Sequence, residues 1–197
     1  MKKLLFIPMI IALLCSCERT ESFYVYEDVV PGTTIKESQL GKVTHQEFLD
    51  STEDEYYALA GCYPCIRSGR KVYYSTDKDD TPSYSGTFYG NTWRFKSDYL
   101  EQLEWWLGGN NNSILSYMNY SYDGNVLSGI LFDQIADSRE YRVLYADKEC
   151  LIFETDGKTN NKYNNEGAEF SRLIYTRSTL LDELYAPQDT VDLRASM

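Results

Sequence analysis

From Gly61 onward the chain is a succession of short apolar and aromatic runs separated by turn residues. Among the turns, Asp123-Gly124-Asn125 follows a tyrosine-rich alternating run, and an Asp-Gly pair suits the positive φ positions of a type I′ hairpin turn. Aromatic residues make up 15% of the chain, and aromatic side chains pack well on the half-buried surfaces of pleated sheets. We predict strands near residues 62–67, 70–76, 85–96, 99–107, 113–122, 126–132, 139–147, 149–156 and 168–176.

Helices are predicted only at the two ends of this strand-rich region. Residues 44–47 and 52–55 both have the Ser/Thr-x-x-Glu form of a capping box, and the second predicts a helix over residues 53–60. Ser178 is predicted to cap a final helix over residues 179–185.

Eight or nine consecutive strands with no helix predicted between them indicate an all-β fold, built as an antiparallel up-and-down meander. We expect this meander to close into an eight-stranded barrel, because closure removes the exposed edges of a sheet. The short N-terminal helix and the C-terminal helix would then flank the barrel. Residues 99–107 also match a helical period through Tyr99, Leu103 and Trp106, so a helix is the alternative for that segment.

The N-terminus has the pattern of an export signal. Two lysines precede an apolar run over residues 4–14, which is too short for a permanent membrane span and suits a signal peptide. Ser16 then stands immediately before Cys17. This resembles the lipobox of bacterial lipoproteins, and the resemblance implies that residues 1–16 are removed and that Cys17 is acylated. The alternative is an ordinary secretory signal followed by a chance cysteine.

On this interpretation residues 17–50 are a lipid anchor and flexible tether, residues 51–188 are the barrel domain and residues 189–197 are a tail. Glu18 follows Cys17, whereas Asp at that place tends to mean inner-membrane retention, so the resemblance implies the outer membrane, on its periplasmic or its exterior side. Removal of Lys2 and Lys3 with the signal leaves 17 basic side chains against 30 acidic ones, a net charge of −13. Nucleic acid is therefore excluded as a partner, because so acidic a chain is repelled by phosphate backbones.

A short helix, an eight-stranded meander and a C-terminal helix together resemble the lipocalin-like lipoproteins of diderm bacteria, over roughly residues 52–185. Lipocalins open their first strand with Gly-x-Trp, and an Arg near the end of the last strand packs across that Trp at the closed end of the barrel. Gly61-Cys62-Tyr63 occupies the first place here, with Tyr for Trp, and Arg172 occupies the second. The resemblance implies a barrel-end plug of Gly61, Tyr63 and Arg172, and the departure to Tyr widens the expectation to a calycin-type barrel. On a strand, Phe170, Arg172 and Ile174 share one face.

Cys62-Tyr63-Pro64-Cys65 is the sharpest local motif. Redox catalysis by such a pair needs the first thiol at a helix N-terminus, but here a predicted helix ends before the motif and strands follow it. We therefore expect no enzyme, with thiol chemistry at Cys62 and Cys65 as the outsider, and favour a structural disulfide in an oxidising compartment. The bridge joins either the two neighbours or one of them to Cys150, and the latter is favoured because Cys62 and Cys65 face opposite sides of an extended strand. Buried unpaired thiols are the remaining alternative.

Other catalytic and metal chemistry has little support. His45 is the only histidine and lies outside the strand-rich region, where we predict an exposed polar residue. The acidic run at residues 77–80 lacks the Gly and Glu positions of a calcium-binding EF-hand loop. We expect no metal site and no cofactor.

Alternation places Tyr89, Asn91, Trp93 and Phe95 on one face, and Tyr141, Val143 and Tyr145 on another. If both faces point inward, they form an aromatic and partly polar cavity for a small apolar or amphipathic ligand, lined by Trp93, Phe95, Tyr141 and Tyr145. The alternative is that these side chains simply fill a small barrel. The sequence thus predicts a monomeric, lipid-anchored binding module of the cell envelope. Its alternative function is docking of a partner protein or glycan through a Tyr-rich exterior and loops.

Overall fold

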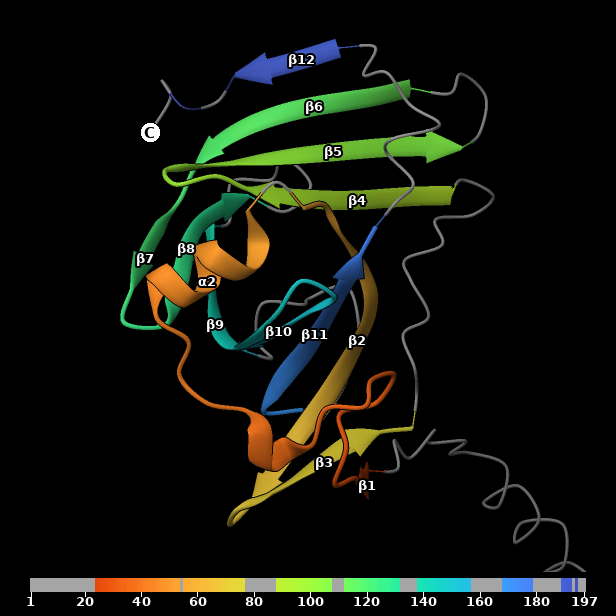
Figure 1. The fold of residues 1–197 in the computed structure, drawn as a ribbon. Coiled ribbons are helices and arrows are strands. Elements are labelled where there is room, and N and C mark those ends of the chain that lie inside the picture. The colour runs from red at the N-terminus through yellow and green to blue at the C-terminus, as the bar shows by residue number, and fades with distance from the viewer. Residues whose placement is uncertain are drawn as a thin grey trace, which may run out of the picture.

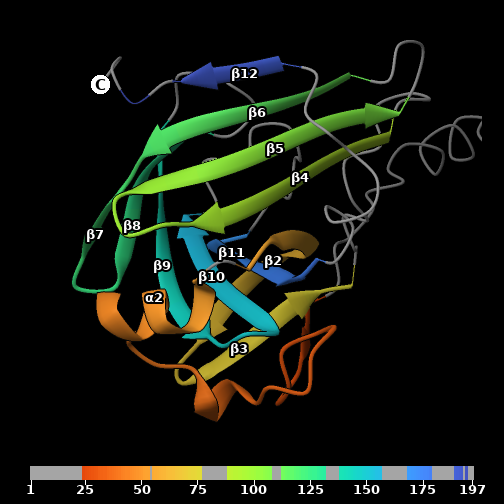
Figure 2. The same cartoon turned by 45° about the horizontal axis from the view of Figure 1, so that its top comes forward.

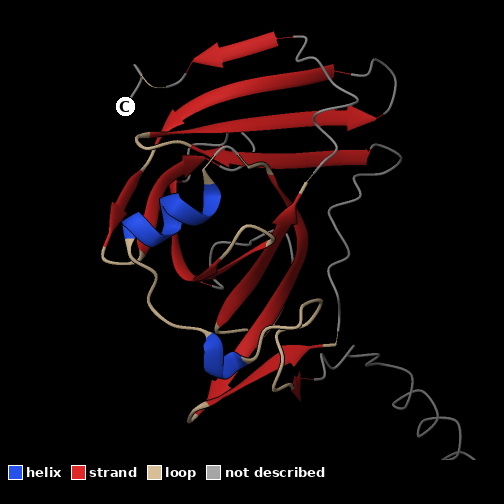
Figure 3. Cartoon of the chain, in the orientation of Figure 1, coloured by secondary structure: helices blue, strands red, loops and turns tan. Residues whose placement is uncertain are grey.

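The computed structural model of the chain describes residues 24–53, 55–76, 88–107, 112–131, 138–156, 168–178, 189–192 and 194. These residues form an all-β fold, as predicted, with one short α-helix and one 3-10 helix (Figures 1 and 3). The helices are α2 (His45–Thr52) and η1 (Glu37–Gln39).

All twelve strands that the described residues form belong to one sheet, ordered β12-β6-β5-β4-β2-β11-β10-β9-β8-β7, with β3 paired to β2 and β1 to β3. Every pairing is antiparallel except that of β12 with β6, which is parallel. The strands are β1 (Tyr24–Tyr26), β2 (Tyr57–Ser68), β3 (Lys71–Ser75), β4 (Phe88–Phe95), β5 (Tyr99–Leu107), β6 (Asn112–Asn119), β7 (Ser121–Asp123), β8 (Val126–Leu131), β9 (Ser138–Ala146), β10 (Cys150–Asp156), β11 (Phe170–Arg177) and β12 (Asp189–Asp192).

Each predicted strand corresponds to a strand of the structure, and β5 has the predicted bounds. The helical alternative for residues 99–107 is wrong, because residues 100–107 pair with β4 on one side and residues 99–106 pair with β6 on the other. The predicted run 113–122 is interrupted at Tyr120, which separates β6 from β7.

The predicted eight strands and closed barrel are not confirmed: the described sheet has twelve strands, and its path ends at β12 and β7. Between β2 and β4 the pairing is reduced to two residue pairs, Tyr57 with Trp93 and Ala58 with Thr92. The sheet is nevertheless strongly curled (Figures 1 and 2). β6 and β7 are separated by a single residue, and together they border β5 on one side and β8 on the other.

The predicted helix over residues 53–60 is wrong, because the first of the two capping boxes is the one that begins a helix. The Thr44 hydroxyl accepts a hydrogen bond from the Glu47 N–H at 3.3 Å, and the Glu47 carboxylate accepts one from the Thr44 N–H at 2.8 Å. From Tyr57 onward the chain is extended as β2, where it pairs along β11. The aromatic residues of that segment and its pairing with β11 favour a strand more strongly than the capping box at residues 52–55 favours a helix. The predicted helix at residues 179–185 lies outside the described residues.

The predicted flexible tether is also wrong for residues 24–50, which form a layer against the sheet. β1 pairs with β3, and Val30, Ile35 and Phe48 are buried. Cys17 and the rest of the predicted anchor lie outside the described residues. At the other terminus, part of the predicted tail 189–197 is the strand β12.

The sheet has a separate apolar core on each face. The inner core gathers side chains from α2 and from strands far apart in the sheet path: Phe48, Tyr57, Trp93, Phe95, Leu100, Met118, Leu127, Tyr141, Val143, Leu151, Phe153, Leu173 and Tyr175. The outer core lies between β2, β3, β10, β11 and the N-terminal layer: Val30, Ile35, Tyr63, Cys65, Val72, Tyr74, Cys150, Ile152, Phe170 and Ile174. Because β4 and β9 are not neighbours in the path but touch through the inner core, the inner face is concave.

Candidate functional site

An aromatic cluster fills the middle of the inner core. The Trp93 ring stacks on Tyr175 with centroids 4.5 Å apart, and it meets Tyr141 at 5.6 Å, Phe95 at 6.0 Å and Phe153 at 6.1 Å. All five side chains are buried. The structure therefore brings three of the predicted ligand residues, Trp93, Phe95 and Tyr141, together on the concave face. The side chains of Tyr89 and Asn91 lie outside the described ones.

Tyr145 does not join this cluster, contrary to the prediction. A register shift between β9 and β10 places Tyr145 opposite Ile152 but Val143 opposite Phe153, so Leu144 is an extra residue in β9. Such a bulge reverses the alternation beyond it. Tyr145 packs against the outer core, and its hydroxyl donates to Asp147 at 2.7 Å. This hydrogen bond, with some burial, raises the pKa of Tyr145 to about 12.

Helix α2 covers one end of the concave interior (Figure 1). Its Phe48 ring lies 4.8 Å from Phe95 and 5.4 Å from Tyr122. The Tyr57 hydroxyl donates to the Ser51 carbonyl at 3.1 Å and so fixes the helix to β2. The short connections 96–98, 124–125 and 147–149 all lie at this end. The connections at the opposite strand ends, 77–87, 108–111, 132–137 and 157–167, lie outside the described residues.

Beyond the aromatic cluster, away from α2, the inward side chains become polar. Gln102 lies opposite Trp93, and Ser116 lies opposite Gln102. On the other side of the interior, Thr155 lies opposite Ser171, two positions along their strands from the inner-core residues Phe153 and Leu173. The four polar side chains, which we call the polar layer, are all buried.

Several polar atoms of this interior have no hydrogen-bond partner within the described part of the chain: Trp93 Nε1, Ser116 Oγ and Thr155 Oγ1. A buried donor or acceptor left unpaired costs about 1–3 kcal/mol. Such groups in native proteins usually pair with protein atoms or ordered water. Aromatic surface beside buried, available polar atoms is the chemistry of a small-molecule site.

The predicted plug residues do come together, but on the outer face rather than across the end of the interior. Arg172 and Tyr63 are directly opposite each other on β11 and β2, and both are buried. A Cβ on Gly61 would lie 2.6 Å from Tyr63 Cε2, so the Tyr63 ring needs a glycine at that position. As predicted, Arg172 shares its face with Phe170 and Ile174, and its guanidinium lies 5.4 Å from the Phe170 ring centroid.

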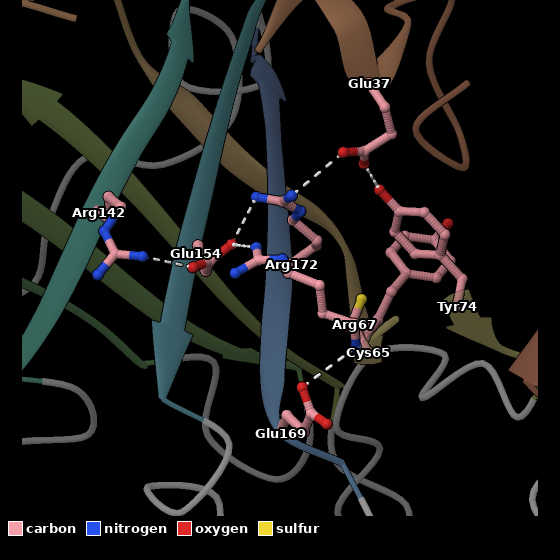
Figure 4. A network of polar contacts seen from close by, with 9 residues as sticks. Glu37, Cys65, Arg67, Tyr74, Arg142, Glu154, Glu169 and Arg172 are labelled. Carbon is pink, nitrogen blue, oxygen red and sulfur yellow. Dashed lines mark hydrogen bonds and ion pairs between the residues drawn. The ribbon is translucent and has the colours of Figure 1, made fainter. Parts of the chain in front are cut away.

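Arg172 belongs to a network of charges that Figure 4 shows. Glu154, whose side chain is 8% exposed, forms ion pairs with Arg142 at 2.6 Å, Arg67 at 2.9 Å and Arg172 at 3.0 Å. Arg172 also reaches Glu37 of η1 at 3.3 Å. The network thus joins β2, β9, β10 and β11 to the N-terminal layer, which is a structural role.

Tyr74 completes this network, since its hydroxyl donates to Glu37. Burial, followed by that hydrogen bond, raises the pKa of Tyr74 well above its ordinary value. Tyr74 therefore stays a neutral donor at physiological pH.

No disulfide joins any two of Cys62, Cys65 and Cys150, so the predicted bridge is wrong both between the two neighbours and from either of them to Cys150. Cys65 lies opposite Phe170 and Cys150 opposite Thr176. Six residues of extended strand separate these places by about 20 Å, far beyond the reach of a disulfide, which needs Cα atoms within about 7 Å. Cys62 and Cys65 lie on opposite faces of β2, since the first packs on the inner core and the second belongs to the outer core.

Two of these three thiols, Cys65 and Cys150, lie in environments that disfavour the thiolate form. Burial raises the pKa of Cys65 well above its ordinary value and that of Cys150 to about 12. The thiolate is the reactive form, so these two thiols are protonated and inert at physiological pH.

His45 is half-buried at the start of α2 rather than exposed as predicted. Its ring stacks on Tyr122 with centroids 4.8 Å apart. The candidate site residues that the sequence analysis does not predict are those of the polar layer. Alternation along residues 99–107 and 149–156, continued from Leu100 and Phe153, is the signal that places Gln102 and Thr155 on the inner face.

Comparison of the chain with protein-family models, with curated proteins and with solved structures finds no match. Across the described ranges, no three His, Cys, Asp or Glu side chains are grouped so that they could hold a metal ion. Within the same ranges, no helix has the length and apolar character that a membrane span requires.

Proposed function

We propose that this protein is a lipid-anchored binding module of the bacterial cell envelope that holds a small amphipathic molecule inside a barrel-like sheet. The main support for the proposal is the concave interior. There the aromatic cluster around Trp93 adjoins buried polar atoms that have no hydrogen-bond partner among the described residues. An apolar ligand portion would stack on the aromatic rings, and a polar portion would bond to Trp93 Nε1, Ser116 and Thr155.

The curl of the sheet supports a barrel-like container of the lipocalin kind. β6 and β7 together border both β5 and β8, so a single bent segment links the two sides of the curl. Helix α2 covers one end, and the polar layer lies toward the other. A guest would therefore enter with its apolar part first.

The polar layer also limits the class of ligand. Gln102, Ser116, Thr155 and Ser171 are uncharged, and the buried inner core beside them is apolar or aromatic. An uncharged hydroxyl, amide or carbonyl group suits these partners better than an ionised one, because a buried charge needs an opposite charge.

The lipid anchor in this proposal rests on the lipobox-like sequence that ends at Cys17. Two or more acyl chains anchor a protein stably without any membrane-spanning helix. The acidic balance of the chain is compatible with this mode of attachment, since it requires no basic surface.

The interior can be tested with N-phenylnaphthylamine, a neutral amphipathic probe whose fluorescence rises in an apolar site. We expect saturable enhancement with the full chain in mild detergent, above a blank of the detergent alone. Ser116→Leu, which fills the polar layer, is expected to abolish it. Ser97→Leu in the exposed β4–β5 connection is the matched control and is expected to bind like the wild type.

Thr155→Val keeps the side-chain shape and removes only the hydroxyl. It therefore still tests the proposal if the Ser116→Leu chain does not fold. We expect weaker probe binding with an unchanged or higher melting temperature. Absence of saturable enhancement in the wild type, or full binding by a folded Ser116→Leu chain, would contradict the proposal.

Docking of a partner protein or glycan through the exterior is the second candidate. Tyr99 and Tyr117 lie side by side on β5 and β6 with ring centroids 6.0 Å apart, and the Arg194 guanidinium lies over both at 5.2 and 5.1 Å. Tyrosine and arginine are enriched at the centres of interfaces. This function would be favoured if the interior binds no probe and if Tyr117→Ala loses binding to a partner protein or glycan.

A further inference from the structure

The exposed apolar surface of the described chain is concentrated in one strand. Among the described residues, only Val25 and Tyr26 are large hydrophobic side chains left exposed, at 44% and 42%. Both belong to the three-residue strand β1. β1 pairs with β3 alone, so it is an outer edge of the sheet.

In the sequence, β1 is also the described strand nearest to Cys17, the proposed lipid anchor. Cys17 precedes Tyr24 by seven residues, and seven residues of fully extended chain span at most about 25 Å. If Cys17 carries lipid, β1 cannot lie farther than this from the bilayer. This step rests on the proposed function.

The side chains around β1 suit the interface of a bilayer. The Lys71 Nζ lies 4.7 Å from the centroid of the Tyr26 ring, and the Tyr73 ring is 5.8 Å from it. Tyrosine is enriched at the level of lipid headgroups, and lysine extends its apolar stem along such a surface while its ammonium stays in water. Arg70, beside Lys71, is exposed as well.

We propose that the edge formed by β1 and β3 rests on the surface of the membrane that holds the anchor, with Val25 and Tyr26 among the phospholipid headgroups. The exposed Glu27 and Asp28 follow on the same edge and offset Arg70 and Lys71. The contact is therefore interfacial rather than electrostatic, and it depends little on salt.

This contact orients the whole molecule, because β1 is part of a fixed layer. The register of β1 on β3 pairs Tyr26 with Tyr73 and Tyr24 with Ser75. Behind it, Val30 and Ile35 are buried in the outer core. The protein would thus lie on the bilayer in one orientation instead of moving freely on a tether.

The experiment uses the full lipidated chain in vesicles of phosphatidylethanolamine with a minor share of phosphatidylglycerol, with and without brominated acyl chains. Tyr26→Trp adds a fluorophore at the proposed contact, and Tyr99→Trp adds one on β5 as the matched control. We expect brominated lipid to quench the added fluorescence of Tyr26→Trp and to leave that of Tyr99→Trp unquenched. The quenching is expected to persist at high salt.

Amide hydrogen exchange of the unmutated chain provides a second measurement. Residues 24–26 and 70–75 are expected to exchange more slowly in vesicles than in the Cys17→Ala chain without vesicles. If the measured mass shows lipid on Cys17 but Tyr26→Trp is unquenched or the hydrogen exchange is unchanged, this inference is overturned while the lipid anchor stands. A chain without lipid that does not float with vesicles would overturn both.

Discussion

Arg172 is the most deeply buried arginine of the charge network on the outer face. It is 3% exposed and bridges Glu154 of β10 and Glu37 of η1. Removal of one partner from a buried ion pair leaves an uncompensated charge, which destabilises a fold by about 3–5 kcal/mol. We expect Arg172→Ala to lower the free energy of unfolding by that amount, as measured by urea denaturation.

Arg142 supplies the matched control, because it pairs with the same carboxylate from a side chain that is 53% exposed. Exposed pairs contribute about 1 kcal/mol or less, so Arg142→Ala should be mild. Equal losses for Arg142→Ala and Arg172→Ala would show that burial of the network is not what stabilises it.

Gly61 tests the packing of Tyr63 at the same scale. A Cβ at this position meets the Tyr63 ring at 2.6 Å, whereas a Cβ at Gly41 meets no atom within 4 Å. We expect Gly61→Ala to destabilise by about 1–3 kcal/mol through overpacking, and Gly41→Ala to change stability by about 0.5 kcal/mol or less. Thermal unfolding measures both. Addition of Tyr63→Ala should make the Gly61→Ala change nearly neutral, and a full additional loss would refute the clash.

At the scale of the elements, the capping box of α2 predicts a pH dependence. Hydrogen bonds from Thr44, first from its backbone N–H and then from its hydroxyl, hold the pKa of Glu47 below its ordinary value of 4.5. A carboxylate whose pKa is lowered on folding stabilises the fold above the unfolded pKa, and this contribution is lost as the pH falls through the folded pKa. The stability difference between wild type and Glu47→Gln should therefore be steady above pH 4.5 and shrink below it.

Urea unfolding at a series of pH values measures that difference. Gln46→Ala on the same helix is the control, since its bond to Asp50 is unrelated to the cap. A Glu47→Gln difference that stays constant down to strongly acidic pH would argue against the cap.

The register of the strands predicts the behaviour of the thiols. Because Cys65 and Cys150 lie opposite residues six positions apart on β11, a reducing agent should leave the melting temperature unchanged. The denatured mass should match that of the chain with all three thiols reduced. A mass about two Da lower, or a melting temperature that falls under reduction, would mean that the pairing of β2, β10 and β11 is incorrect.

The strands themselves are the part of the fold that local sequence predicts best. Residues 99–107 alternate and end at turn residues, so β5 is recovered with its bounds, and Trp93, Phe95 and Tyr141 are correctly grouped. Alternation fails where one extra residue enters, as at Leu144, because nothing local to β9 marks that bulge. Tyr145 is lost from the predicted site for this reason.

What the sequence does not predict is set by contacts distant along the chain. Residues 44–47 and 52–55 have the same capping-box form. The second box is followed by β2, whose first residue, Tyr57, pairs with both β11 and β4, so the chain becomes a strand there and not a helix. Burial of Val30 and Ile35 depends on an outer core built by four later strands. The parallel addition of β12 to β6 has no local signal either.

In the whole molecule, the two faces of the sheet differ in what covers them and in their chemistry. Its convex side is covered by the N-terminal layer and held by the charge network around Glu154 (Figure 4). Its concave side gathers aromatic rings and then polar atoms that the described chain leaves unpaired. The first arrangement stabilises the fold, and the second is suited to a guest.

The most direct test of ligand binding in the interior is native mass spectrometry of the full chain, extracted in mild detergent from its own membrane and compared with its denatured mass. We expect a reproducible extra mass in the native spectrum, beyond the covalent lipid that both spectra share, and the value of that mass would give the ligand class. Identical native and denatured masses, for a chain whose sheet is folded, would mean that the interior is filled by the protein itself and would contradict the proposed binding function.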